Sequence, residues 1–169
     1  MLNRVVRAID AVSTAAGWLA GWFIVPITVA VSYEVIARYA FSAPTKWSYE
    51  AGWMLYGAQF MLAASYTLLK GGHIRTDVFY ERWSPRTRAT IDAICYVLFF
   101  FPGMLCIFYA GFVEAHNTWQ IGERTGLRIA FVPVPMYWLK AVIPLTAALL
   151  VLQGISELIR CTRVIRSAR

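Results

Sequence analysis

Four long apolar stretches with few charges constrain the fold of this 169-residue chain more than any other feature. An α-helix rises about 1.5 Å per residue, so roughly 20 apolar residues cross a hydrocarbon core about 30 Å thick. Lipid offers no partner for the backbone, which favours helices. The sequence therefore predicts an all-α polytopic membrane protein, a single domain over residues 1–169, with four spans at about 11–37, 50–70, 90–114 and 134–158.

Composition and charge narrow the class further. The chain is 59% hydrophobic and 15% aromatic, and its 16 Lys and Arg exceed its 9 Asp and Glu to give a net charge of +7. Such a surplus indicates nucleic acid when it forms a stripe on a soluble face. Here the basic residues flank the apolar stretches, so we expect membrane lipid and no nucleic acid as a partner. The three cysteines form no CxxC pair, and we interpret them as small buried residues.

The distribution of basic residues predicts the orientation. Four spans place both termini and the second connector on one side of the membrane. The basic residues on that side are Arg4, Arg7, Lys70, Arg75, Arg82, Arg86, Arg88, Arg160, Arg163, Arg166 and Arg169. The basic residues on the other side, or close to that surface of the membrane, are Arg38, Lys46, Arg124, Arg128 and Lys140. By the positive-inside rule the N and C termini are cytoplasmic.

The first apolar stretch could also be the core of a secretory signal peptide, because basic residues precede it and Ala30-Val31-Ser32 resembles a cleavage site. The run from Ala11 to Tyr33 is longer than the usual core of about 7–15 residues. We therefore interpret it as a membrane span.

Several residues within the spans predict local features. Gly17 and Gly21 lie one turn apart, so a neighbouring helix could approach closely there. Gln59 lies near the middle of the second span, and we expect its amide to form an interhelical hydrogen bond and not to line a substrate path. We expect kinks at Pro26 and at Pro102.

Both mouths of the second span carry distinctive polar residues. Before the span, we expect Arg38 to pair with Glu34 or Glu50 and Trp47 to sit at headgroup depth. After the span, His73 and Asp77 fall on the cytoplasmic side. A metal ion would need more ligands than these two side chains, so we expect them to make structural hydrogen bonds. The following segment around Val78, Phe79 and Trp83 is expected to form a short interfacial helix.

The predicted spans lack the side chains that catalysis or ion transport within the membrane would need. Proteins that move ions or acids usually hold charged residues there, and this chain has no acidic residue in the central part of any span. Lys140 lies about a turn from a mouth, and its stem can carry the ammonium to the headgroups. No hydrolase triad, zinc pair or P-loop occurs, and His73 and His116 lie outside the spans. We expect no enzyme, cofactor or metal, and a helical scaffold that works through a partner.

The residues around the second span resemble a known family, the DctQ-like small membrane subunit of tripartite ATP-independent periplasmic (TRAP) transporters. The pattern R-Y-x-F-x-x-P-x-x-W-x-x-E is followed by G-H-x-x-x-D. The matching residues are Arg38, Tyr39, Phe41, Pro44, Trp47 and Glu50, then Gly72, His73 and Asp77. The length, the number of spans and the orientation resemble the family over nearly the whole chain.

The resemblance implies two partners in a bacterial inner membrane system. A large membrane subunit would carry the substrate and sodium sites and move like an elevator against a frame to which this chain belongs. A periplasmic binding protein would deliver an organic acid to the outer face. Gly17, Gly21 and Gln59 are then candidates for packing against the large subunit, and Lys46, Arg124 and Arg128 for docking the binding protein.

Two other classes of function stay open. A small four-span membrane enzyme that uses glutathione would have a similar size, and basic residues at its mouths could hold the anionic cofactor. A small exporter that works alone would also have this size, although it should carry a carboxylate within the membrane. Turnover of glutathione, or transport by this chain alone, distinguishes these classes from a transporter subunit.

Overall fold

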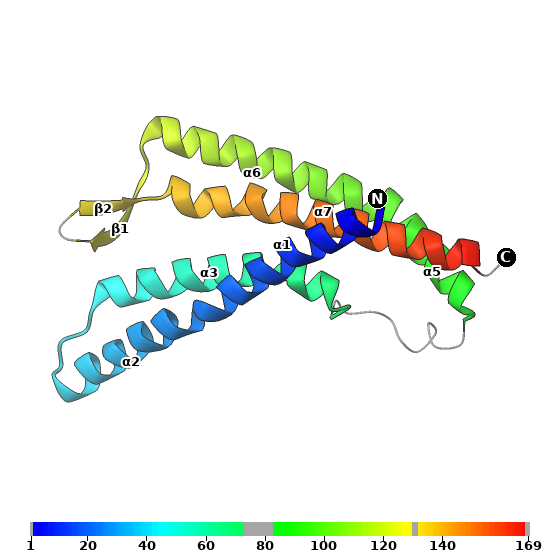
Figure 1. Ribbon diagram of the computed structural model, residues 1–169. Coiled ribbons are helices and arrows are strands. Elements are labelled where there is room, and N and C mark those ends of the chain that lie inside the picture. Colours follow the sequence, from blue (N-terminus) through cyan, green and yellow to red (C-terminus); the bar gives the residue numbers. More distant parts are fainter. Residues whose placement is uncertain (1, 73–82, 130–131, 168–169) are drawn as a thin grey trace.

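The computed structural model describes residues 2–72, 83–129 and 132–167. The elements in order are α1 (Leu2–Trp22), α2 (Ile24–Ala40), α3 (Lys46–Leu69), α5 (Pro85–Cys95), the π-helical turn η1 (Tyr96–Phe100), α6 (Phe101–Ile121), β1 (Arg124–Ile129), β2 (Val132–Pro135) and α7 (Tyr137–Ser167). α1 and α2 form one long rod, and α5, η1 and α6 form another (Figure 1). With α3 and α7 the described part of the chain has the four helical rods that the hydropathy predicted.

Three of these rods are long and apolar enough to cross a membrane by length and composition. They are Asn3–Ala40, Pro85–Ile121 and Tyr137–Ser167. The fourth rod, α3, has 24 residues and is not among these three. The predicted class of all-α polytopic membrane protein is confirmed.

The second outer connector differs from its prediction. The sequence placed the third span at about 90–114, with a connector before the fourth span, but α6 continues to Ile121 and ends at Gly122, whose φ of +69° suits a left-handed helix end. The next residues form an antiparallel hairpin in which Arg124 lies opposite Pro135 and Ile129 lies opposite Val132. The helix therefore continues beyond the end expected for the third span, and the hairpin was not predicted.

The α1–α2 rod buries one narrow seam of mostly small side chains. The buried residues recur at intervals of seven, as Val6, Ser13 and Ala20 in α1 and Ala30 and Ala37 in α2. A seven-residue repeat keeps one stripe of a long helix facing its neighbours, as in coiled coils. Because these side chains are small, the rod lies close to α3, and most of its remaining surface stays exposed.

The two predicted proline kinks lie beside irregular turns. Pro26 has no N–H, and shortly before it the helix is broken at Phe23, whose N–H bonds a carbonyl three residues back at 3.1 Å. Pro102 follows the π-helical turn, where the N–H of Phe101 bonds the carbonyl of Tyr96, five residues back. In each case the chain departs from regular α-helix just before the proline.

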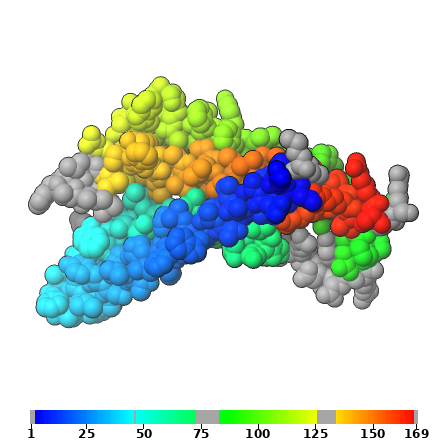
Figure 2. All heavy atoms as spheres, in the orientation of Figure 1, coloured from blue at the N-terminus to red at the C-terminus, as the bar shows by residue number. Residues whose placement is uncertain are grey.

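The rods pack in a row and not as a closed bundle. α3 packs against the α1–α2 rod on one side and α7 on the other, and α6 packs mainly on α7. The α1–α2 rod crosses the row obliquely, touching α7 near the end where α1 begins (Figure 2). Gly111 permits close contact between α6 and α7, because a Cβ there would lie 2.7 Å from Ile143. Cys95 and Cys106 are exposed, so their predicted burial is wrong.

A polar cluster joins α1 to α7, and we call it the inner clasp. It consists of Asp10, Ser13, Gln153, Ser156, Glu157 and Arg160. Gln153 is fully buried, accepts a hydrogen bond from Ser13 at 2.8 Å, and donates to Asp10 at 3.3 Å and to Glu157 at 3.1 Å. Arg160 reaches Asp10 at 2.5 Å and Glu157 at 2.7 Å. These bonds tie the first helix to the last.

The ends of the rods sort into two groups, as an even number of spans requires. α1 begins and α7 ends at the same end of the row, where α3 also ends and α5 begins (Figure 1). The α2–α3 turn and the β-hairpin lie at the opposite end. We call the first end inner and the second outer, following the charge-based orientation.

The inner clasp predicts a specific effect of Gln153→Leu. The substitution removes an amide that serves three partners, and leaving buried polar groups unpaired costs about 1–3 kcal/mol each. We expect a clear fall in the unfolding temperature of the detergent-solubilised protein. Gln59→Leu is the matched control, because Gln59 is half-buried and bonds no described group. Equal shifts for the two variants would contradict a special role of the clasp.

The orientation can be checked by cysteine labelling in intact cells. Ser42 and Ser84 are both exposed, and Ser42 follows α2 at the outer end whereas Ser84 precedes α5 at the inner end. We expect Ser42→Cys to react with a thiol reagent that cannot cross the membrane, and Ser84→Cys to react only after the cells are opened. The reverse pattern would overturn the orientation.

Candidate functional site

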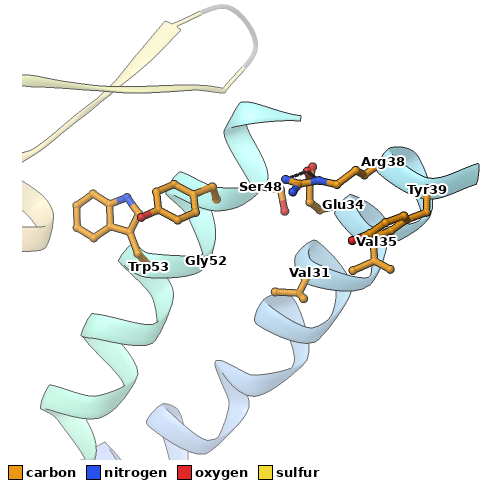
Figure 3. Close-up of a pocket in the computed structure, with 9 residues that line it drawn as sticks. Val31, Glu34, Val35, Arg38, Tyr39, Ser48, Gly52 and Trp53 are labelled. Atoms are coloured by element: carbon orange, nitrogen blue, oxygen red, sulfur yellow. Dashed lines mark hydrogen bonds and ion pairs between the residues drawn. The ribbon is translucent and has the colours of Figure 1, made fainter. Parts of the chain in front are cut away.

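The outer turn between α2 and α3 is organised around the carboxylate of Glu34, and we call it the outer elbow. One oxygen of Glu34 accepts hydrogen bonds from Nε and Nη2 of Arg38, at 3.0 and 2.6 Å. The other accepts the backbone N–H of Thr45 at 2.8 Å and the Thr45 hydroxyl. Figure 3 shows Glu34 between the guanidinium of Arg38 and the start of α3. The carboxylate thus connects the end of α2 to the first residue before α3.

The local sequence explains the shape of the elbow. α2 ends at Ala40 with Phe41 as its C-cap residue, and Ser42 takes a positive φ of 50°, which turns the chain back. The N–H of Ala43 then bonds the carbonyl of Ala37 at 3.0 Å, and Pro44 cannot extend the helix. Thr45 precedes α3 in an extended conformation, and its hydroxyl donates to Glu34 and makes no capping bond.

Two further contacts hold the first turn of α3 against α2. The Ser48 hydroxyl is buried and donates to the carbonyl of Ala30 at 2.7 Å. The rings of Tyr33 and Trp47 lie 5.5 Å apart. Trp47 therefore has a packing partner as well as the exposed surface expected of a headgroup anchor.

A shallow cavity of about 360 Å³ opens between α2 and α3 beside the elbow (Figure 3). Its lining consists of Val31, Glu34, Val35, Arg38, Tyr39, Ser48, Tyr49, Gly52 and Trp53. The Glu34 and Arg38 charges in the lining are already paired with each other. The cavity can accept an apolar or aromatic group, but its described residues offer no nucleophile paired with a base.

A second ionic contact holds the β-hairpin to the bundle. The ammonium of Lys140 lies 2.8 Å from Glu114 at the end of α6 and 2.8 Å from Glu123 just before β1. The N–H of Met136 also bonds the carbonyl of Glu123 at 2.9 Å. Hydrogen bonding to Lys140 holds the pKa of Glu123 below its ordinary value of 4.5. The stabilisation from this pair is therefore present above pH 4.5 and is lost as the pH falls through the lowered pKa.

The outer elbow brings together some, but not all, of the residues in the family pattern that begins at Arg38. Of the two partners expected for Arg38, the structure has Glu34 and not Glu50. The side chains of Tyr39 and Phe41 are exposed. Glu50 keeps one carboxylate oxygen buried without a hydrogen-bond partner.

The inner part of the motif is described only at its first residue. Gly72 follows the end of α3 and donates its N–H to the carbonyl of Thr67 at 2.9 Å. His73 and Asp77, like the interfacial helix expected around Val78 and Phe79, lie outside the described residues.

The residues expected to dock a binding protein lie at the outer end. Lys46 begins α3, Arg124 begins β1, and Arg128 stands opposite Pro133 in the hairpin. Strand β1 packs against α3, the helix that follows the elbow. Arg124 is exposed, and the side chains of Lys46 and Arg128 are outside the described part of the chain.

The residues expected to pack against another subunit differ in their surroundings. Gly17 meets the chain's own Tyr66, because a Cβ on Gly17 would lie 2.5 Å from the Tyr66 side chain. Gly21 has nothing within 4 Å of such a Cβ. Gln59 makes no hydrogen bond to a described group, so the interhelical bond favoured from the sequence is not found among the described residues, and Gln153 makes bonds of that kind.

Sequence reasoning missed the residues that pair over long distances. Thr45, Ser48, Glu114 and Glu123 were not singled out, and only the local spacing of Glu34 and Arg38 gave a signal for any part of the outer contacts. Within the described ranges no three His, Cys, Asp or Glu side chains gather as a metal site would require.

These features define a polytopic helical membrane protein whose described charges in the bundle mostly hold its own helices together. Residues 27–164 match the family model of the DctQ component of tripartite ATP-independent periplasmic transporters, so the chain belongs to that family of transporter components. A comparison with curated proteins gave no match.

Glu34→Ala should loosen the outer elbow. The change removes the acceptor of the Thr45 N–H and the partner of Arg38, so the first turn of α3 loses this link to the end of α2. We expect faster amide hydrogen exchange over residues 43–48. Glu114→Ala is the control, since Glu114 lies on α6 and leaves Glu123 to hold Lys140. Unchanged exchange at residues 43–48 in Glu34→Ala would contradict the role given to Glu34.

Proposed function

We propose that this chain is the small membrane subunit of a TRAP transporter in a bacterial inner membrane, and that it acts as a fixed scaffold. A larger membrane subunit would carry the solute and sodium sites and move against this scaffold. A periplasmic binding protein would deliver an organic acid to the outer face. The transporter as a whole would then import the acid by sodium symport.

The observation that supports the scaffold role is the use of charge within the described bundle. In the inner clasp and the outer elbow the charged side chains form ion pairs with one another, within this chain. A chain that moves a charged solute itself usually presents polar groups to a path through the membrane. Membership of the DctQ family supports the same assignment.

The open row of helices supports a contact with a larger subunit. The rod that contains α6 packs mainly on α7 and exposes a long apolar face. Its exposed residues include Leu98, Phe99, Leu105, Tyr109, Phe112 and Trp119. Lipid or another membrane subunit can cover such a face, and on our proposal the large subunit covers part of the exposed surface, with Gly21 and Gln59 as further candidates for contact.

The outer end supports a contact with the binding protein. The elbow and the hairpin project from the same end of the row, and Arg124 is exposed there. We propose that Lys46, Arg124 and Arg128 form a basic docking surface. His73 and Asp77 would lie at the opposite face and would act through folding or assembly with the large subunit.

Reconstitution into liposomes tests the function. We expect uptake of the organic acid only when this chain, the large subunit and the binding protein are all present with an inward sodium gradient. Uptake by this chain alone would favour a small exporter, and turnover of glutathione by this chain alone would favour a membrane enzyme.

The same system tests the docking surface through Arg124→Glu. Weakened docking is a mass-action defect, so uptake should fall and be partly restored by more binding protein. His73→Ala and Asp77→Ala are the comparison variants, whose defects should not respond to binding protein. Rescue of these inner variants, but not of Arg124→Glu, would refute the proposed division of roles.

A further inference from the structure

The cavity beside the outer elbow has an apolar floor and a polar mouth. Its volume of about 360 Å³ lies within the range of about 300–1,000 Å³ that is typical of ligand pockets. On α2, Val31 and Val35 precede Arg38 by seven and three residues, so the apolar lining extends about 10 Å along the helix from Arg38. On α3, which begins at the outer end, Gly52 and Trp53 continue this lining toward the membrane interior (Figure 3).

The side chains of this chain leave the floor of the cavity open. A Cβ on Gly52 would have nothing within 4 Å. Tyr39 and Tyr49, which also line the cavity, are 80% and 76% exposed. Because the hydrocarbon core of a membrane holds no water, an apolar space at this place is filled by an acyl chain or by an apolar segment of another protein.

Arg38 supplies a group that can recognise an anion at the mouth. Its Nε and Nη2 bind Glu34, but a guanidinium has five N–H donors, so further donors remain for a second acceptor. The Arg38 side chain is 56% exposed, whereas that of Glu34 is 13% exposed. Glu34 also accepts two hydrogen bonds from Thr45, which share in balancing its charge. An anion that approaches from outside therefore meets the guanidinium and not the carboxylate.

The combination of floor and mouth selects one class of ligand. The planar guanidinium matches the oxygen atoms of a phosphate, and tyrosine rings are typical of headgroup depth, where lipid phosphates lie. A free phosphate ion would use Arg38 but not the apolar floor, and an apolar protein segment would use the floor but not the cation. A phospholipid uses both.

We propose that the outer elbow holds one phospholipid molecule. Its headgroup phosphate binds the exposed edge of Arg38 between the hydroxyls of Tyr39 and Tyr49, and one acyl chain lies along the floor formed by Val31 and Gly52. The inference goes beyond the proposed function. It requires only that the chain crosses a membrane with the elbow at headgroup depth, so it stands or falls independently of the transporter partners.

Gly52→Leu tests the floor of the site. The added side chain enters open space, and leucine favours a helix more than glycine does, so the fold should be kept. We expect the affinity of the purified full-length chain for phosphatidylglycerol to fall at least about tenfold, because displacing about two buried methylene groups corresponds to that factor. The measurement is a lipid titration of the detergent-solubilised chain by native mass spectrometry.

Gly103→Leu on α6 is the matched control. A Cβ at Gly103 would also have nothing within 4 Å, and Gly103 does not line the cavity. It should leave the affinity for phosphatidylglycerol unchanged. Equal affinities of the Gly52→Leu chain and the unsubstituted chain would overturn the inference.

Arg38→Lys tests the mouth of the site. Lysine leaves a cation for Glu34 but lacks the planar fork that suits a phosphate. We expect weaker binding of phosphatidylglycerol and unchanged binding of diacylglycerol with the same acyl chains, at an unchanged unfolding temperature. If the unsubstituted chain binds diacylglycerol as tightly as phosphatidylglycerol, the phosphate is not recognised and the inference is overturned.

Two further outcomes would assign the cavity to another occupant and overturn the inference. Displacement of the lipid by millimolar inorganic phosphate would indicate a simple anion site at Arg38. If Gly52→Leu weakens binding of the large membrane subunit and leaves phosphatidylglycerol binding unchanged, a protein segment fills the cavity. The proposed function would stand in both cases.

Discussion

The membrane interior offers no water to a buried polar group, and the positions of the paired charges in this chain follow from that constraint. At the inner end, Asp10, Gln153 and Arg160 satisfy one another across α1 and α7. At the outer end, Glu34 satisfies both a guanidinium and the backbone of the turn. Between these two places the helices meet through small side chains, so the polar contacts define which helices are neighbours and the small residues set how closely they lie.

The helical class and the number of long helical rods could be predicted from the sequence, because a backbone in lipid has very few ways to satisfy its hydrogen bonds. Kinks were predicted at Pro26 and Pro102, and the chain departs from regular α-helix shortly before each of them. For Arg38 the sequence allowed two partners. The choice of Glu34 depends on the turn, which brings the Thr45 N–H to the same carboxylate and adds a donor that Glu50 does not receive.

The long-range contacts could not be predicted, because they depend on how each helix is rotated and on which helix lies beside it. Gln59 and Gln153 are both single amides in apolar segments, and only the fold shows that Gln153 meets Ser13 and Asp10, the latter 143 residues away. The hairpin was missed for a related reason. Its short strands are held by Glu123 and Lys140, 17 residues apart, and a short two-stranded hairpin alone is at best marginally stable in water.

The length of the first rod has a consequence for the bilayer in which the protein sits. Asp10 and Glu34, which anchor the inner clasp and the outer elbow, are 24 residues apart on nearly continuous helix, a distance of about 36 Å. A hydrocarbon core about 30 Å thick fits between them at a tilt of roughly 35°, within the range of membrane helices. The fixed separation of the two carboxylates thus sets the hydrocarbon thickness that the rod can span with both of them outside the lipid. In a thicker bilayer the rod must stand more upright or draw one of its ion pairs into the lipid.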